Sequence, residues 1–195
     1  MTQAPLPLNE AQRIASLRGL HILDTPYEER FDRITRLAQR LFSVPIALVS
    51  LIDVNRQWFK SCIGLDLRET PRSTSFCAHA ILSDEALVIP DAQLDPRFAD
   101  NPFVTGPPHI RFYAGQPLVG PNNQKLGTLC IIDRRPRQLD TDNLNALRSL
   151  AALAENELNT VEMNQALAIK EESEARVRAV MENIADGIIT FDEQG

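Results

Sequence analysis

Two matched apolar segments, far apart in the chain, constrain the fold more than any other feature of this sequence. PIALVSLID covers 45–53 and KLGTLCIID covers 125–133. Both are short, rich in β-branched residues and apolar at both alternating sets of positions, which is typical of strands buried on both faces. Their length, the flanking turn residues and the lack of a long helical period favour strands over buried helices. The sequence therefore predicts a sheet with these two strands at its centre, helices on one face and irregular segments on the other.

Two amphipathic helices are expected before the first of these strands. The first begins at Asn9. The second has Thr25 as its N-cap, Pro26 in the first helical position and Glu28 completing a capping box. The apolar residues that repeat at helical spacing along this second helix, and are expected to pack on the sheet, are Phe31, Ile34, Leu37, Ala38 and Leu41.

Each matched strand belongs to a predicted hairpin, and a long irregular stretch lies between the two hairpins. The first strand returns through 57–64, and a strand at 110–118 returns through 125–133. Between them, 65–109 is rich in proline and contains only a short helical segment and one short strand. Loops of this length are uncommon inside domains and are often functional, so this stretch is the expected place for a binding site.

Charge and cysteine content exclude several classes of protein. The net charge of -6 argues against nucleic-acid partners and anionic membrane surfaces, which require a concentrated positive field. No segment approaches the roughly 20 apolar residues of a membrane span, so we expect no membrane insertion. Three cysteines without a CxxC pair, and an N-terminus without the features of a secretory signal, fit a reducing cytoplasm.

A long helix is predicted from Asp142 onward, with an apolar seam at heptad spacing. Two interpretations are open for its first part, which either packs on the chain's own sheet or joins a second copy in a parallel homodimer. Gln165 and Glu172 interrupt the seam further along and should weaken its C-terminal half. The residues expected at the dimer seam are Leu144, Leu147, Ala151, Ala154, Leu158 and Val161.

Four blocks of sequence resemble a GAF domain, a bacterial sensory module. They are ILDTPYEERFDRITRLAQRLFSVPIALVSLID, RQWFKSCIGLDLRETPRSTSFCAHAI, LVIPDAQLDPRFADNPFVTGPPHIRFYAGQPL and LGTLCIID. The resemblance implies an α/β (α+β) fold with a six-stranded antiparallel sheet whose first and last strands are adjacent at its centre. It also divides the chain into an N-terminal helix (1–21), the GAF domain (22–158), a coiled-coil linker helix (159–178) and a tail (179–195).

The tail resembles the opening of a PAS domain, with an entry helix followed by a strand at 188–192. Proteins that begin with GAF, helix and PAS commonly end in a domain for cyclic di-GMP synthesis (diguanylate cyclase) or degradation, or in a histidine kinase. This chain carries none of those output motifs. The expectation is a cytoplasmic sensory domain that detects a small molecule or a redox signal and controls an output through a dimeric helix.

The segment SFCAHAI places Cys77 two residues before His79, a pairing that suggests a nucleophile with its base, a metal pair or a haem contact. On a helix, however, this spacing directs the two side chains about 200° apart, so neither can serve the other. A metal ion would need two further ligands, which no motif supplies. We therefore expect no catalytic and no metal site here, and a structural or pocket-lining role for both residues.

The region 91–113 concentrates a few polar groups among aromatic side chains, as a small-ligand site requires. An alternative is that Arg97 and Arg111 pair with nearby carboxylates and only pin the loop. The sequence does not identify the ligand or a cofactor. The candidate ligand-binding residues are Phe76, Cys77, His79, Asp91, Arg97, Phe98, Arg111 and Tyr113.

Two further functions compete with the sensory one. One GAF-like family reduces free methionine sulfoxide, which requires a thiolate nucleophile with a resolving cysteine close by. The spacing of Cys62, Cys77 and Cys130 does not indicate such a pair, and Cys62 and Cys130 are interpreted as core residues. The other alternative is a dimerisation scaffold without a ligand, which predicts no pocket for a small molecule.

Overall fold

The computed structural model describes the backbone of residues 2–192. It describes side chains up to residue 160 and, beyond it, at 167, 170, 171 and 173–177. The chain divides into two units, Met1–Asn159 and Thr160–Gly195. The first contains the sheet and the elements that pack on it, and the described part of the second, up to Asp192, is the later part of the last helix.

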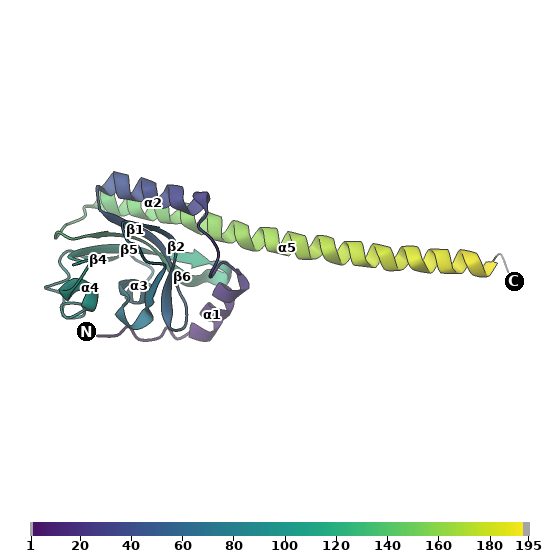
Figure 1. Ribbon diagram of the computed structural model, residues 1–195, viewed down its shortest axis with the longest axis horizontal. Helices are drawn as coiled ribbons and strands as arrows, with labels where there is room; N and C mark the ends of the chain where they lie inside the picture. The colour runs from purple at the N-terminus through teal and green to yellow at the C-terminus, as the bar shows by residue number, and fades with distance from the viewer. Residues whose placement is uncertain (1, 193–195) are drawn as a thin grey trace. The chain divides into compact units, whose positions relative to one another are not determined.

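A six-stranded antiparallel sheet forms the centre of the first unit (Figure 1). Its order is β3-β2-β1-β6-β5-β4, so β1 and β6 are central, as their apolar patterns predicted, and adjacent, as the resemblance to GAF domains implied. Every residue of β1 is buried, which confirms a strand covered on both faces. The strands are β1 (Ile46–Ile52), β2 (Arg56–Ile63), β3 (Glu69–Pro71), β4 (Leu87–Ile89), β5 (Phe112–Gly120) and β6 (Gln124–Asp133).

Helices cover one face of this sheet. The helix α2 (Glu29–Phe42) and the first part of α5 (Thr141–Asp192) lie side by side there (Figure 1), joined by an ion pair of 2.5 Å between Arg33 and Glu157. The shorter α1 (Glu10–Gly19) packs near β6. The backbone amide of Val119 in β5 donates a 2.8 Å hydrogen bond to the Glu155 carboxylate, which fastens α5 to the sheet.

The predicted start of α2 is wrong. The helix begins at Glu29, with Glu28 in the N-cap position, three residues later than the capping-box pattern suggested. The hydroxyl of Thr25 instead donates to the Ile22 carbonyl and accepts from Lys60, which also binds the Pro26 carbonyl. The buried ammonium group of Lys60 needs hydrogen-bond acceptors, and Thr25 and Pro26 provide them. These long-range contacts hold Thr25 and Pro26 outside the helix, although the local sequence favours a helix start there.

The predicted buried face of α2 is only partly correct. Phe31, Ile34 and Ala38 are buried, but Leu37 is 50% exposed and Leu41 is 60% exposed. Thr35 takes part in the buried face instead, because its hydroxyl lies 2.7 Å from that of Ser61 on β2. The interior face of the helix therefore follows hydrogen bonding as well as apolar character.

The opposite face of the sheet carries the long irregular segment. This segment supplies the two edge strands of the sheet, β3 and β4, and over the face itself the 3-10 turn η1 (Arg72–Thr74) and the short helices α3 (Phe76–Ala80) and α4 (Pro102–Thr105). The predicted helical segment and short strand are confirmed as α3 and β4, whereas β3 was not anticipated. This face is therefore covered by short elements and loops, as predicted.

At the C-terminal end, α5 continues as a helix to Asp192 and includes 188–192, where the PAS resemblance predicted a strand. A lone strand leaves its backbone groups without partners, whereas a helix satisfies them internally. The coiled-coil linker and the PAS assignment stay predictions, since the side chains of Val161, Gln165 and Glu172 lie outside the described residues.

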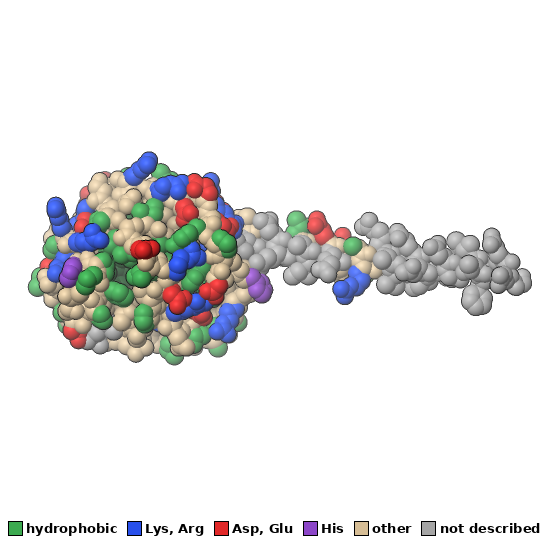
Figure 2. Space-filling view, viewed as in Figure 1, with side chains coloured by type: hydrophobic (Ala, Val, Ile, Leu, Met, Phe, Trp, Pro, Cys, Tyr) green, Lys and Arg blue, Asp and Glu red, His purple; other side chains and the backbone are tan. Residues whose placement is uncertain are grey.

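Acidic, basic and apolar side chains are interspersed on the visible face of the first unit (Figure 2). Many basic groups are neutralised by ion pairs, as where Arg56 binds both Asp24 and Glu69 at 2.6 Å. In the part of the chain that the structure describes, no helix has the length and apolar character needed to cross a bilayer.

Candidate ligand-binding site

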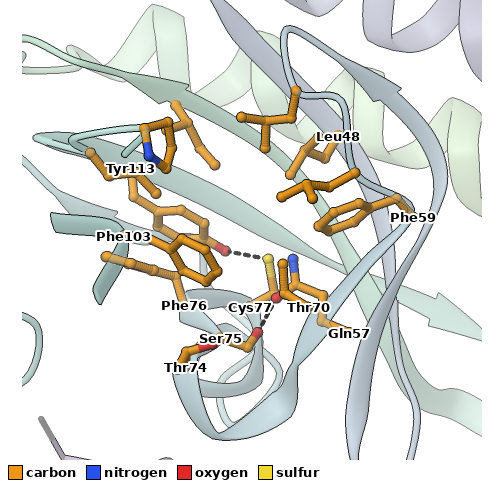
Figure 3. Close-up of a pocket in the computed structure, with 15 residues that line it drawn as sticks. Leu48, Gln57, Phe59, Thr70, Thr74, Ser75, Phe76, Cys77, Phe103 and Tyr113 are labelled. Atoms are coloured by element: carbon orange, nitrogen blue, oxygen red, sulfur yellow. Dashed lines mark hydrogen bonds between the residues drawn. The ribbon is translucent and has the colours of Figure 1, made fainter. Parts of the chain in front are cut away.

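A small cavity lies between the sheet and the irregular segment (Figure 3). Its volume is about 40 Å³. Apolar side chains from the strands form its floor, among them Leu48, Phe59 and Ile132, and Phe103 contributes to the wall opposite. Leu67 also lines it and is 44% exposed, so the cavity reaches the surface. An apolar chamber with a few polar groups at one end is the usual form of a small-molecule site.

The polar end of the cavity is built around α3. Ser75 caps this helix, because its hydroxyl accepts a 3.0 Å hydrogen bond from the Ala78 amide. The same hydroxyl contacts the side chain of Gln57 on β2 (Figure 3). This cap fixes the direction of the first turn of α3, which directs the Cys77 thiol into the cavity wall.

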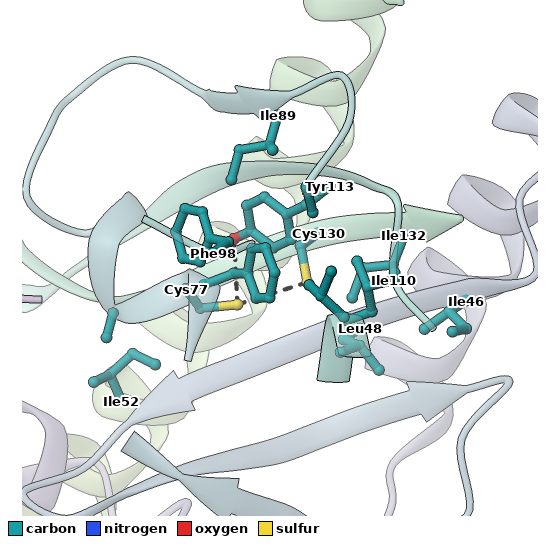
Figure 4. Packing of buried hydrophobic residues seen from close by; sticks show 14 of the residues in the cluster. Ile46, Leu48, Ile52, Cys77, Ile89, Phe98, Ile110, Tyr113, Cys130 and Ile132 are labelled. Carbon is teal, nitrogen blue, oxygen red and sulfur yellow. Dashed lines mark hydrogen bonds between the residues drawn. The ribbon is translucent and has the colours of Figure 1, made fainter. Parts of the chain in front are cut away.

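The Cys77 thiol is part of a buried cluster that joins three strands and α3 (Figure 4). Its sulfur lies 3.8 Å from that of Cys130 on β6 and 3.3 Å from the Tyr113 hydroxyl on β5. Next to them, the hydroxyls of Ser50 on β1 and Thr128 on β6 lie 3.1 Å apart. All three cysteines of the chain are free thiols, and Cys77 and Cys130 are both buried.

These neighbours change the acidity of the two thiols in opposite directions. Burial alone raises the pKa of Cys77, but contacts with Cys130 and with the hydroxyls of Ser50, Thr128 and Tyr113 outweigh it and lower the pKa to about 6. The pKa of Cys130 is raised, by burial and by the adjacent Cys77. The two shifts have opposite directions, so the pair favours a single thiolate in contact with a neutral thiol over two thiolates.

The position of Tyr113 depends on a glycine two residues along the same strand. A β-carbon at Gly115 would overlap the ring and hydroxyl of Tyr113, which occupy that space. Gly115 is also the strand partner of Cys130 across the β5–β6 pair. The absence of a side chain at Gly115 therefore lets the Tyr113 hydroxyl lie over the sheet and point at Cys77.

Of the eight candidate ligand-binding residues, three line the cavity: Phe76, Cys77 and Tyr113. Phe98 lies behind Phe76, stacked on it with 4.1 Å between ring centroids. His79 contacts the edge of Phe98 and lies 3.0 Å from the Thr2 carbonyl through its Nε2 atom, and burial lowers its pKa. Cys77 and His79 therefore have different neighbours, which agrees with the prediction that their spacing on the helix directs the two side chains apart.

The three charged candidates stabilise the loop. Arg97 pairs with Asp95 at 2.6 Å, Arg111 donates to the Val104 carbonyl, and Asp91 accepts from the Gln93 amide. These contacts match the alternative in which the charges hold the loop in place. Within the described residues, no group of three or more His, Cys, Asp or Glu side chains is arranged to hold a metal ion.

The expected dimer seam is occupied within the first unit. Leu147, Ala151, Ala154 and Leu158 are all fully buried in the single chain, and Leu144 is half-buried. The alternative in which this part of α5 packs on its own sheet accounts for them, because a residue buried in the monomer has little surface left for a second copy. The side chain of Val161 lies outside the described residues.

Sequence reasoning missed two members of the site. It treated Cys130 as an isolated core residue and found no second thiol near Cys77, whereas the two sulfurs lie 3.8 Å apart. It also gave no role to Gly115. A glycine at mid-strand is a recognised signal for the close approach of another group and pointed to this position.

The chain belongs to the GAF domain family, whose model matches residues 26–158. A cyclic di-GMP phosphodiesterase of Pseudomonas aeruginosa is 50% identical over 137 residues, which cover 70% of this chain and 23% of that protein. The chain thus spans about a quarter of this curated relative and is homologous to that part of it.

Solved structures share the fold at low sequence identity. The GAF domain of an Acinetobacter phosphoenolpyruvate-protein phosphotransferase matches with a TM-score of 0.57 at 17% identity, over 75% of this chain and 92% of that one. Free methionine-R-sulfoxide reductase from Neisseria meningitidis, solved with its substrate, matches with a TM-score of 0.57 at 14% identity, over 85% and 98%. A domain of a putative two-component sensor histidine kinase protein from Sinorhizobium meliloti matches with a TM-score of 0.54 at 14% identity, over 73% of this chain and 97% of that one.

Proposed function

We propose that this chain is the cytoplasmic sensory region of a longer signalling protein, in which the GAF domain detects a small molecule or an oxidant and controls the turnover of cyclic di-GMP. The observation that carries the proposal is the cavity of about 40 Å³ between the sheet and the irregular segment, with an acidic thiol in its wall. The 50% identity to part of a cyclic di-GMP phosphodiesterase supports this output over a histidine kinase.

A route from the cavity to α5 is available through β5. Tyr113, near the start of this strand, borders the cavity, and the Val119 amide near its end holds the Glu155 carboxylate of α5. A change at the cavity that shifts β5 therefore alters the packing of α5. Signalling then requires two packings of similar free energy, one of which the signal favours.

We propose that a homodimer transmits this difference. Within the first unit, the outer surfaces of α2 and α5 expose Leu37, Leu41 and Leu153, and the two helices are neighbours through Arg33 and Glu157. These exposed leucines, rather than the residues buried against the sheet, would be covered by the second copy in this dimer. Sedimentation of the chain with Leu37→Glu and Leu41→Glu, compared with the parent, tests this surface.

An enzyme of the methionine sulfoxide reductase type is the second candidate, and the Cys77–Cys130 pair favours it. The cavity argues against it. Methionine sulfoxide carries an ammonium and a carboxylate group that need charged partners when they are buried, and no Asp, Glu, Lys or Arg is among the residues that line the cavity. We expect no reduction of free methionine sulfoxide by the chain when a dithiol reductant is supplied.

The sensory proposal is tested by filling the cavity in the full-length protein. Ile110 lines the cavity from a loop, so Ile110→Phe should occupy the space at an overpacking cost of about 1–3 kcal/mol. Leu94→Phe is the matched control, because Leu94 is 81% exposed. We expect cyclic di-GMP turnover to change in the first variant and not in the second. Equal turnover in both, with both folded, would support a scaffold instead.

A further inference from the structure

We propose that Cys77 and Cys130 form a peroxide-reactive dithiol, in which Cys77 is oxidised by a small hydroperoxide that enters the cavity and Cys130 resolves the product to a disulfide. This inference rests on the proposed sensory function and names the signal and the residues that receive it. It does not require methionine sulfoxide as a substrate, because the proposed oxidant is a small hydroperoxide.

The first observation is the geometry of the two sulfurs. At 3.8 Å they are at van der Waals contact, and they lie on two different layers, Cys77 on α3 and Cys130 on the central strand β6. Figure 4 shows both thiols pointing toward each other between α3 and the sheet. A disulfide needs about 2.05 Å between sulfurs. Bond formation therefore draws the loop-borne helix toward a rigid strand.

The second observation concerns how an oxidant reaches Cys77 and which group stabilises the Cys77 thiolate. Cys77 lines the cavity, whereas Cys130 is not among the lining residues, so an entering oxidant meets Cys77 first. The Tyr113 hydroxyl, 3.3 Å from the Cys77 sulfur, stabilises the thiolate that attacks. The cavity has room for water-sized molecules, and hydrogen peroxide is little larger than water, so it can reach the Cys77 sulfur.

The reaction balances in two steps. The Cys77 thiolate attacks one oxygen of the hydroperoxide, a sulfur–oxygen bond forms, the oxygen–oxygen bond breaks, and the leaving oxygen takes a proton to give water or an alcohol. Cys77 is now a sulfenic acid. Cys130 then attacks the Cys77 sulfur, the sulfur–sulfur bond forms, and the hydroxide that leaves combines with the Cys130 proton as water. Two thiols are oxidised and one hydroperoxide is reduced.

The third cysteine provides a built-in control. Cys62 faces the same side of the sheet, since Cys62 pairs with Leu48 on β1 and Leu48 pairs with Cys130 on β6. Two strand spacings, about 10 Å, separate it from Cys130. Burial also raises the pKa of Cys62 to about 11, so it remains a thiol at neutral pH. Cys62 is therefore too distant to form a disulfide with Cys130 without backbone movement, and too weakly acidic to compete with Cys77 for the oxidant.

Disulfide formation also has a structural consequence. Cys77 shares α3 with Phe76, whose ring stacks on Phe98 at 4.1 Å and on Tyr113 at 5.2 Å. A displacement of α3 toward β6 therefore shifts this aromatic stack and the loop that carries Phe98. Formation of the disulfide at Cys77 therefore changes the packing of the irregular segment as a whole.

The experiment is peroxide treatment of the reduced chain, followed by thiol blocking under denaturing conditions and peptide mapping by mass spectrometry. We expect a single linked peptide pair containing Cys77 and Cys130, with Cys62 blocked and unlinked. Cys62→Ser should leave this result unchanged. Cys130→Ser, with Cys130→Ala as a second variant should the serine destabilise the strand, should leave a sulfenic acid on Cys77 that dimedone captures.

Three results would overturn the proposal: Cys77 unmodified at peroxide levels that oxidise free cysteine, a disulfide that includes Cys62, or equal dimedone labelling of Cys77 with and without Cys130. An experiment that rules out the dithiol reaction can be distinguished from one that rules out the proposed sensory function. Mapping reads the thiols without any output, whereas the Ile110→Phe comparison reads the output without changing a thiol.

Discussion

The two faces of one sheet differ in how they are covered. Because side chains alternate along a strand, β1 sends Ala47 and Val49 toward the helices on one side and Leu48 toward the cavity on the other. The helix face is closed by two long helices, and its polar groups, such as Ser61 and Asp32, bind one another at 2.6 Å. The cavity face is closed by short elements and holds an open space with an acidic thiol.

This difference separates stability from sensing. Regular helices pack closely because their side chains interdigitate along whole turns, and such packing leaves little room for a ligand. A cover made of short elements leaves gaps and moves at lower free-energy cost. The same strands can therefore supply a rigid support on one side and a responsive site on the other.

The largest effect is expected from a matched pair of leucine truncations. Leu129→Ala on the helix face should lower the free energy of unfolding by about 4 kcal/mol, because the fully buried side chain leaves an empty cavity. Leu48→Ala should cost about 2.5 kcal/mol, since part of that side chain already faces open space. Urea unfolding measures both. Equal costs would mean that the two faces are packed alike.

The second effect concerns the anchor of the cavity-face segment. Glu10 binds Arg13 through two 2.8 Å hydrogen bonds and Arg72 of η1 through one of 2.5 Å. Glu10→Gln should cost about 2–3 kcal/mol, because it leaves two buried guanidinium groups short of a partner. Glu69→Gln, at a carboxylate that is 51% exposed, is the control and should cost less than about 1 kcal/mol.

The same anchor predicts a dependence on pH. Burial raises the pKa of Glu10, but hydrogen bonds from Arg13 and Arg72 outweigh it and lower the pKa from 4.5 to about 2. The folded state therefore binds this proton less readily than the unfolded chain. Its stabilisation is complete above about pH 4.5 and is lost as the pH falls toward 2, so Glu10→Gln should flatten the acid side of the stability profile. An identical profile in parent and variant would contradict this account.

A smaller effect is expected from the polar network on the helix face. Ser61→Ala removes the hydroxyl that donates to Asp32 at 2.6 Å and meets that of Thr35 at 2.7 Å. Loss of a hydrogen bond to a carboxylate should cost about 1–2 kcal/mol. Thermal unfolding measures the loss, and the reactivity of the Cys77 thiol should stay as it was. A change in thiol reactivity would show that the two faces are not independent.

The smallest effect on stability is expected at Tyr113. Tyr113→Phe removes one hydroxyl and should change the free energy of unfolding by less than about 1 kcal/mol. Its effect on acidity is distinct: without this donor the thiolate is less stable, so the pKa of Cys77 should rise from about 6. Ultraviolet absorbance of the thiolate against pH, in a Cys62→Ser background, measures the shift. An unchanged midpoint would remove Tyr113 from the thiol environment.

Much of the fold could be predicted, because buried strands show in the pattern of apolar residues and the resemblance to GAF domains implied the order of the central strands. The apolar character of β1 and β6 at both sets of positions placed them correctly at the centre of the sheet. The start of α2 could not be predicted, since it depends on the buried Lys60, which belongs to a distant strand. Local capping signals do not include such tertiary contacts.

The place of the cavity could be predicted, but the contacts within it could not. The length of the irregular segment predicted a binding site between this segment and the sheet, and a cavity lined by Phe76, Cys77 and Tyr113 lies there. That a ligand binds in this cavity stays a prediction. The approach of Cys130 to Cys77 was hidden, because a strand that is apolar on both faces gives no sign of which face each residue joins. The sequence alone therefore predicted where the cavity lies, but not that two thiols are in contact beside it.

Hydrogen–deuterium exchange of the whole chain, before and after peroxide treatment, tests most directly the claim that the cavity face responds while the helix face supports it. We predict changes in α3 and the loops of the segment 64–110, with smaller changes near Val119 and Glu155, and unchanged protection in β1 and α2. Cys77→Ser should abolish them. Changes confined to α2, or equal changes over both faces, would contradict the account.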